Sequence, residues 1–348
     1  MKYIITFILA VNVQLLNAQL VTDDLIHPVD LAQYTMAGYG VNVSNVSYSG
    51  NLDAFGSFDG ANTFLPFNEG IIMTTGTVKD NGYGLHGPND ESDTGLDVGT
   101  PGYEPLNSLA NEDTYNAAIL EFDVVVNYDS IQLDYIFGSE EYPEFTGSQF
   151  TDAMAIFISG PGFGNDTVNI ALTPNTNQGI NINTINESSN SFLYVDNGDG
   201  LTAPYNENPQ YIQYDGYTTP MKAIAAVEPG ETYHMIIAIA DGGDGHFDSG
   251  IFIKANSLTT STNENHPLDK ISIYPNPVRS EFTINNIDPT EIEDLKIIST
   301  TGKEIQFNQN YSSNSKLQVK LKNASPGIYW VKFFTKNGKL YTSKLLVK

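Results

Sequence analysis

Apolar and polar residues alternate through the middle of the chain in the pattern of half-buried β-strands. Apolar side chains occupy every second position of residues 120–126 and of residues 131–137. A period of two places one strand face on a core and the other toward water. Residues 153–158 and 233–240 are almost unbroken apolar runs, which is typical of strands covered on both faces. No long segment has the 3.6-residue period of a helix, so we expect an all-β protein.

The charge distribution divides the chain into two parts. Residues 19–262 contain 33 acidic and three basic residues, whereas residues 263–348 contain eight acidic and twelve basic ones. So abrupt a change favours two independently folded units, and a length of 348 residues suits two domains. We therefore expect a large β-sandwich or jelly roll over 19–257, a polar linker over 258–269 and a small Ig-like β-sandwich over 270–348.

Composition excludes several classes of function. The formal net charge of −25 makes nucleic acids and anionic lipids poor partners, because both are bound through Lys and Arg. The chain has no cysteine. This excludes a disulfide framework, a thiolate zinc site, an iron–sulfur cluster and a cysteine nucleophile.

The first 18 residues have the composition of a signal peptide. Lys2 precedes an apolar run over residues 4–11, and a small residue, Ala18, stands before Gln19. The run is too short to span a bilayer, which needs about 20 apolar residues. We therefore expect cleavage between Ala18 and Gln19. No later segment can span a membrane as a helix, so the mature protein is expected outside the cell or attached to its outer surface.

The C-terminal part carries four motifs in a fixed order. They are Y-P-N-P at 274–277, T-G-K at 301–303, P-G-I-Y at 326–329 and a basic C-terminus, K-L-L-V-K. In this order they closely resemble the type A C-terminal sorting domain of the type IX secretion system. The resemblance implies a Gram-negative cell, Sec export to the periplasm and recognition by the type IX machinery at the outer membrane. It also implies a domain that is often removed, with the cargo released or joined to a surface glycolipid.

The larger part resembles the choice-of-anchor L domain from about residue 31 to residue 257. Its most specific motifs are S-E-E-Y-P-E-F at 139–145 and D-S-G-I-F at 248–252. The resemblance implies an exported protein that combines this domain with an anchoring or sorting signal. It implies a location rather than a chemistry.

Six acidic residues lie at the ends of the predicted apolar strands. Carboxylates in such places are costly unless they are paired or coordinated, and three lysines cannot neutralise them all. Calcium is bound by carboxylate, carbonyl and water oxygens, so we expect a calcium ion held by some of these acids. The alternative, equally open, is that they cap turns by accepting backbone N–H groups. The candidate ligands are Glu140, Glu141, Asp152, Asp241, Asp244 and Asp248.

Catalysis is the less favoured interpretation. Two carboxylates can act as the acid and base of a glycosidase, and Glu141 and Asp241 could converge from different strands. However, adjacent residues such as Glu140 and Glu141 face opposite ways on a strand. The histidines stand apart, without a metalloenzyme spacing, and no phosphate-binding loop precedes a helix. We therefore assign no catalytic or cofactor-binding residue, calcium apart.

A tyrosine-rich segment suggests a glycan-binding surface. Tyrosine offers a flat apolar face with a polar tip, on which a sugar ring can stack. The alternative is that these rings pack over the edge of the sandwich. We expect a non-catalytic structural, adhesive or binding protein with a surface glycan or protein as ligand; a carbohydrate-binding or carbohydrate-degrading protein is the alternative. The candidate glycan contacts are Tyr205, Tyr211, Tyr214 and Tyr217.

Overall fold

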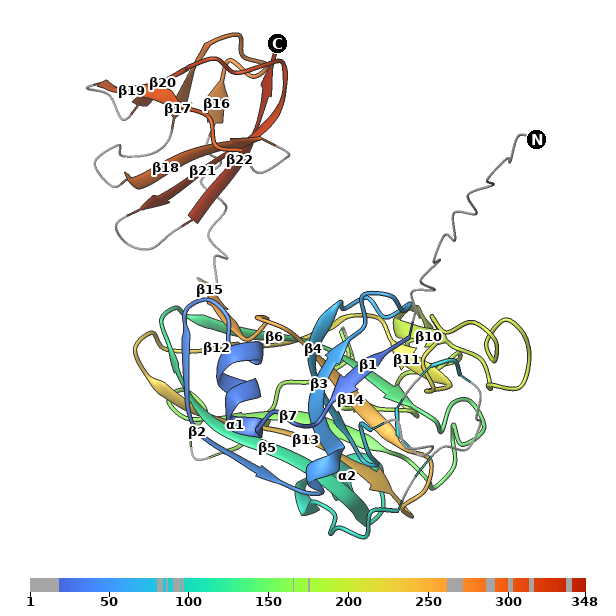
Figure 1. The fold of residues 1–348 in the computed structure, drawn as a ribbon. Coiled ribbons are helices and arrows are strands. Elements are labelled where there is room, and N and C mark those ends of the chain that lie inside the picture. Colours follow the sequence, from blue (N-terminus) through green and yellow to red (C-terminus); the bar gives the residue numbers. More distant parts are fainter. Residues whose placement is uncertain are drawn as a thin grey trace, which may run out of the picture. The chain divides into compact units, whose positions relative to one another are not determined.

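The chain folds into two units, residues 1–261 and 262–348 (Figure 1). The computed structural model describes residues 19–79, 84–85, 87–89, 95, 97–164, 166–174, 176–261, 272–285, 292–299, 303–312, 316–335 and 340–348. The signal peptide over 1–18, most of the predicted linker and the turn at 301–302 lie outside the described residues.

The first unit consists of two antiparallel sheets. In the larger sheet the strand order is β1-β3-β4-β14-β6-β11-β10, with β12 and β15 also paired to β6. Its strands are β1 (Val21–Asp23), β3 (Phe55–Asp59), β4 (Glu69–Thr74), β6 (Ser130–Ser139), β10 (Tyr194–Asp196), β11 (Gly216–Thr218), β12 (Met221–Ala226), β14 (Ser249–Lys254) and β15 (Thr259–Ser261). The smaller sheet has the order β2-β5-β13-β7-β8, with β9 paired to β7. Its strands are β2 (Val41–Ser49), β5 (Thr114–Val126), β7 (Ala153–Ser159), β8 (Val168–Asn169), β9 (Ile180–Asn181) and β13 (Thr232–Gly242).

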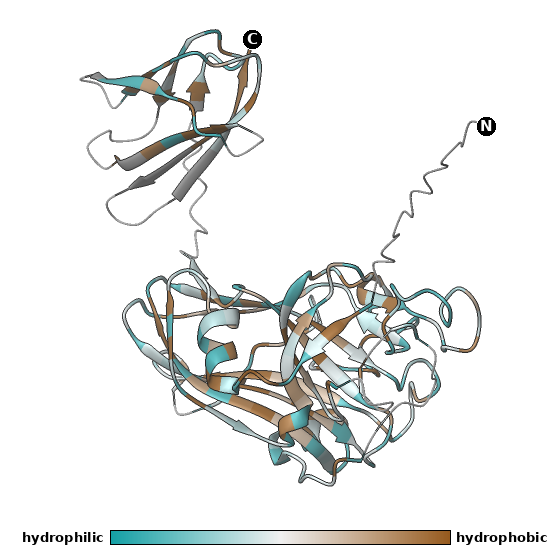
Figure 2. Cartoon of the chain, viewed as in Figure 1, coloured by the Kyte–Doolittle hydropathy of each residue, from teal (hydrophilic) through white to brown (hydrophobic). Residues whose placement is uncertain are grey.

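The main core lies between these sheets. Alternate residues of β5, among them Phe122 and Val124, pack with alternate residues of β6, among them Leu133 and Phe137. Figure 2 shows apolar residues, in brown, along the strands of the first unit. The alternating pattern in the sequence therefore predicted both strands and their buried faces correctly.

The outer face of the smaller sheet is covered by a helix. The helix α2 (Glu104–Ala110) contacts β5, β7 and β13, and its Leu106 packs on Ala155, Ala238 and Ala240. This cover explains why β7 and the second half of β13 are buried on both faces, as their sequences predicted, whereas His234 and Ile236 in the first half of β13 stay partly exposed. The other helical turns are short: α1 (Pro28–Asp30), a π-helix (Leu31–Met36) and 3₁₀ turns at Leu52–Ala54 and Ser191–Leu193. The prediction of an all-β protein is thus confirmed.

The first unit extends further along the chain than the sequence indicated. Leu258, predicted to open the linker, is fully buried and forms a bridge with Ala37. Thr259–Ser261 then form β15 on β6. The polar composition of this segment gave no indication that Leu258 is buried or that Thr259–Ser261 form a strand. The first unit therefore extends to Ser261, and the linker follows it.

The second unit is a small sandwich of two antiparallel sheets. One has the order β16-β17-β20-β19 and the other β18-β21-β22. Phe282, Ile297 and Val331 are among the residues of its own separate core. The strands are β16 (Ser272–Tyr274), β17 (Glu281–Asn285), β18 (Ile292–Ser299), β19 (Phe307–Ser312), β20 (Lys316–Leu321), β21 (Gly327–Thr335) and β22 (Leu340–Val347).

The Y-P-N-P motif is joined to the end of the chain. The side-chain Oδ1 of Asn276 accepts a hydrogen bond from the backbone N–H of Leu346 at 2.9 Å. Val278, just after the motif, donates its N–H to the carbonyl of Leu346 at 2.7 Å and accepts from Lys348 at 2.8 Å. The first and last motifs of this domain are therefore joined to each other by hydrogen bonds.

Candidate functional site

Five of the six predicted acidic ligands are buried where strands of the two sheets end. Glu140 and Glu141 directly follow β6, and Asp248 directly precedes β14 of the same sheet. Asp152 directly precedes β7, and Asp241 lies near the end of β13. All five are less than 5% exposed, whereas Asp244 is half-buried. These acids thus lie at the strand ends where the sequence placed them, and their binding of a metal stays a prediction.

Three of these acids, Glu141, Asp152 and Asp241, form an inner group held by hydrogen bonds. Asp152 Oδ1 accepts from the N–H of Gly242 at 3.1 Å, and its Oδ2 accepts from the Ser249 hydroxyl at 2.6 Å. Glu141 Oε2 accepts from the N–H of Asp152 at 3.1 Å. Asp241 Oδ2 accepts from the amide of Asn116 at 3.0 Å. These bonds tie β6, β7, β13 and β14 together, so the inner acids have a structural role.

Burial favours the protonated form of the inner acids. Loss of hydration raises the pKa of Asp152 to about 8 and that of Glu141 to about 10, with the charge of Asp152 adding to the rise at Glu141. The pKa of Asp241 is raised well above its usual range by burial and then by the charges of Asp152 and Asp248. A carboxylic acid that must stay buried gives up its charge unless a cation compensates it.

The lysines of the first unit pair with other acids. Lys79 forms ion pairs with Asp24 and Asp53, and Lys222 lies 2.6 Å from Asp134. Lys254 lies 3.9 Å from the same Asp134. The three lysines therefore form ion pairs with acids outside the acidic cluster.

Glu140 and Asp248 form a second, outer pair at one small cavity. Their positions are opposite each other across β6 and β14, because Ser139 pairs with Ser249 and the N–H of Glu140 donates to the carbonyl of Asp248 at 3.0 Å. The cavity holds about 10 Å³, the space of a single water molecule or ion. Its lining residues are Thr74, Thr77, Gly84, Leu85, Glu140, Gln213, Tyr214 and Asp248.

No ready-made metal centre of three or more His, Cys, Asp or Glu side chains is found in the described part of the chain. The acids instead divide into the hydrogen-bonded inner group and the outer pair. An ion at the outer pair would therefore depend on neutral oxygens as well as on Glu140 and Asp248. Calcium remains a prediction, with this narrower set of ligands.

The four candidate tyrosines fall into two pairs. Tyr214 and Tyr217 are only 1% and 5% exposed, so their rings cannot stack on a sugar and the prediction for these two is corrected. Tyr205 and Tyr211 are half-buried, with ring centroids 4.9 Å apart, and Tyr211 lies at the same distance from Phe64. Phe64 is 46% exposed. We call Phe64, Tyr205 and Tyr211 the aromatic cluster; its two tyrosines are the part of the tyrosine-rich segment that a ligand can reach, and Phe64 comes from the connection between β3 and β4.

Sequence reasoning missed the neutral residues around the outer pair. Thr74 and Thr77 come from the end of β4, and Gln213 and Tyr214 from the segment before β11. Because β4, β14, β6 and β11 are neighbours in the larger sheet, their ends meet at the cavity. Threonine and glutamine are common residues, and only the strand order brings these together, so no local signal could have identified them.

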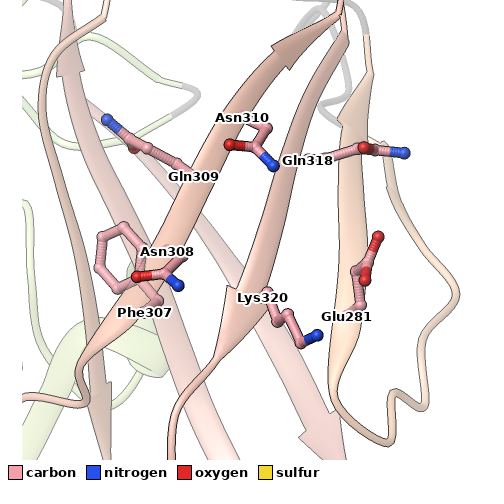
Figure 3. A pocket seen from close by; sticks show the side chains of 7 residues that line it. All are labelled: Glu281, Phe307, Asn308, Gln309, Asn310, Gln318 and Lys320. Carbon is pink, nitrogen blue, oxygen red and sulfur yellow. The ribbon is translucent and has the colours of Figure 1, made fainter.

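The second unit has an open polar hollow of about 390 Å³ (Figure 3). Asn308, Lys320 and Glu281 stand in one row across β19, β20 and β17, and Asn310 and Gln318 in the next. All five side chains are exposed. This face presents hydrogen-bonding side chains at the surface, two of them charged, whereas the cavity of the first unit is lined by buried acids.

Known structures offer only distant likenesses. The BSP domain of a biofilm-associated protein is 7% identical with a TM-score of 0.18, covering 69% of this chain and 50% of its own. A β-1,2-glucanase from Parabacteroides distasonis is 9% identical with a TM-score of 0.23, covering 90% and 39%. The adhesin domain of Epf from Streptococcus pyogenes is 9% identical with a TM-score of 0.20, covering 76% and 91%. With such TM-scores these structures do not inform the function, and no curated protein matches the chain.

Both sequence resemblances are confirmed by family models. The model of the choice-of-anchor L domain matches residues 20–259, and that of the secretion system C-terminal sorting domain matches residues 272–348. Among the described residues, no helix is long and apolar enough to cross a membrane. The sorting domain directs the protein to the cell surface or the medium. The chain thus belongs to the choice-of-anchor L domain family and ends in a type IX sorting domain.

Proposed function

We propose that the protein acts outside the cell as a non-catalytic binding or adhesive module that the type IX machinery recognises through its second unit. The burial of the acidic cluster carries this proposal. The carboxylates that a glycosidase would present to its substrate are here at most 4% exposed, and the adjoining cavity has the volume of a single ion. An acid and base must reach the scissile bond of a polysaccharide, and these residues are placed to hold strands together.

Activity and attachment assays test this function together. Cells that make the full chain are expected to bind glycan-coated or protein-coated surfaces more strongly than cells that lack it. The purified mature protein is expected to release no reducing ends from a panel of polysaccharides. Turnover of a polysaccharide that disappears in Glu141→Gln would refute the non-catalytic assignment, because that change removes an acid while keeping the side-chain shape.

We also propose that calcium stabilises the first unit. Glu140 and Asp248 are buried side by side on neighbouring strands, and two negative charges in such a place would gain from a hard divalent cation. An ion that binds only the folded state stabilises it by about 2.7 kcal/mol at a concentration of 100 times its dissociation constant. We therefore expect the melting temperature of the first unit to rise by roughly 5 °C when calcium replaces chelator. Identical calorimetric melting in chelator and in calcium would refute this proposal.

Glycan binding is a second candidate function, favoured by the aromatic cluster. The Tyr205 and Tyr211 rings meet edge to face beside an exposed Phe64, and such partly exposed aromatic faces suit a sugar ring. Tyr211→Ala is expected to weaken retention on a glycan array at least tenfold, because the central ring of the cluster is lost. Tyr39→Ala is the matched control, since Tyr39 is also exposed and stacks on Tyr128, away from the cluster. Equal loss in both variants, or no retention by the parent protein, would contradict this function.

A further inference from the structure

We propose that one calcium ion binds in the cavity between Glu140 and Asp248, with Thr77 Oγ1 as a neutral ligand. The inference rests on the proposed stabilisation by calcium and specifies where the ion binds. It divides the acidic cluster into an inner group that joins the strands and an outer pair that holds the ion.

The register of β6 and β14 brings two like charges together. Glu140 and Asp248 lie opposite each other, one residue beyond the paired Ser139 and Ser249, and both line the same cavity. Like charges directly opposite on neighbouring strands destabilise a sheet. Here the two residues are 2% and 4% exposed, so water cannot screen them well. A divalent cation between the two carboxylates turns this repulsion into attraction.

Thr77 is a second, independent indication of a ligand. Its side chain lines the cavity, the residue is only 3% exposed, and its Oγ1 has no hydrogen-bond partner among the described residues. A buried hydroxyl without a partner destabilises the folded state, because it has lost its hydrogen bonds to water. An ion in the cavity would accept this oxygen as a ligand and remove that destabilisation.

The lining chemistry favours calcium over other metals. Among the described lining residues, every polar side chain offers an oxygen atom, Gln213 offers its amide nitrogen as well, and none is His or Cys. Zinc prefers nitrogen and sulfur, and magnesium retains several water molecules that a cavity of about 10 Å³ cannot hold. Calcium accepts irregular sets of carboxylate, hydroxyl and amide oxygens.

Gly76 makes room for the Asp248 carboxylate. A Cβ atom at position 76 would lie 1.6 Å from Asp248 Oδ2, so any larger residue would displace this carboxylate. The backbone after β4 is thus shaped around the acid. Gly76→Ala therefore offers a way to move the carboxylate without changing the number of charges.

Equilibrium dialysis of the chelator-treated mature chain with radioactive calcium tests the site. The parent protein is expected to bind one ion per chain. Asp248→Asn and Thr77→Val should each weaken binding at least tenfold, because one loses a charge and the other a ligand oxygen. Thr77→Ser, which keeps the hydroxyl, and Asp196→Asn, at the exposed end of β10 in the same unit, should bind as the parent does.

The outcomes distinguish whether the protein binds calcium at all from whether it binds calcium in this cavity. If the parent binds no calcium, both this site and the proposed stabilisation by calcium are overturned. If it binds one ion and Asp248→Asn and Thr77→Val bind equally well, only the site is overturned. Should Asp248→Asn fail to fold by circular dichroism, Thr77→Val against Thr77→Ser decides, since both keep the carboxylates. Equal binding by those two variants would overturn the role of Thr77 and the site.

Discussion

Deletion of the residues after Pro267 is expected to abolish export across the outer membrane. The truncated protein should accumulate in the periplasm of a cell that has the type IX system, whereas the full chain appears at the surface or in the medium. The reason is that the sorting information lies in residues 272–348, which match the sorting-domain family. Immunoblotting of periplasm, membrane and medium fractions would measure the difference, and we expect a loss of at least tenfold outside the cell.

The structure provides the control that this experiment needs. The main core of the first unit is built only from residues of that unit. Its last described strand, β15, ends at Ser261. Truncation after Pro267 therefore removes none of that core, and the retained protein should resist protease as the full chain does. Conversely, residues 262–348 fused to an unrelated periplasmic protein should carry it outside. If the truncated protein reaches the medium unimpaired, the role assigned to the second unit is wrong.

The strands were predictable because the sheets impose a period on the sequence. Residues 120–126 and 131–137 alternate because each strand has one face on the main core, and residues 153–158 are apolar throughout because α2 covers their outer face. The acidic cluster was predictable for a related reason. A carboxylate at the end of an apolar strand is conspicuous in a sequence, and the ends of β6, β7, β13 and β14 that carry such residues lie close together in this fold.

The sequence alone could not predict which residues from different strands line the same cavity. Nothing near Thr77 indicates that its hydroxyl lies beside Glu140 and Asp248, since strand order alone makes them neighbours. The tyrosine-rich segment shows the same limit, because Tyr211 and Tyr214 look alike in sequence. The ring of Tyr214 lies against Gly138 and Gly250, where a Cβ atom would collide with it, and so it is buried.

The metal-free first unit is expected to lose stability as the pH rises from 5 to 8. Asp152 has a folded-state pKa of about 8 because burial disfavours its charge, whereas an unfolded Asp titrates near pH 3.9. Between these values the folded chain binds one proton more than the unfolded chain. This stabilisation is therefore fully present below about pH 4 and is lost as the pH rises through the folded-state pKa. From pH 5 to pH 8 the loss from Asp152 alone is about 4 kcal/mol, or roughly 10 °C in melting temperature.

Substitution of Asp152 by Asn should reduce this pH dependence. An Asn side chain copies the protonated acid, because its oxygen can accept from Gly242 N–H while its amide donates to the Ser249 hydroxyl. Glu141 and Asp241 remain in the variant and, with their pKa values also raised, keep part of the decline. The other charge facing Asp152 is that of Asp244.

Calorimetry of the metal-free mature chain at pH 5 and pH 8 measures the effect. Asp196→Asn is the matched control, because Asp196 is exposed and its Oδ1 accepts only a local bond from Gly198 N–H at 3.0 Å. We expect the parent and this control to lose the same stability over that interval and Asp152→Asn to lose clearly less. Equal losses in all three proteins would mean that Asp152 is charged in the folded state at pH 5. Its hydrogen bonds to Gly242 and Ser249 would then be strong enough to outweigh burial, and the inner acids would need a cation of their own.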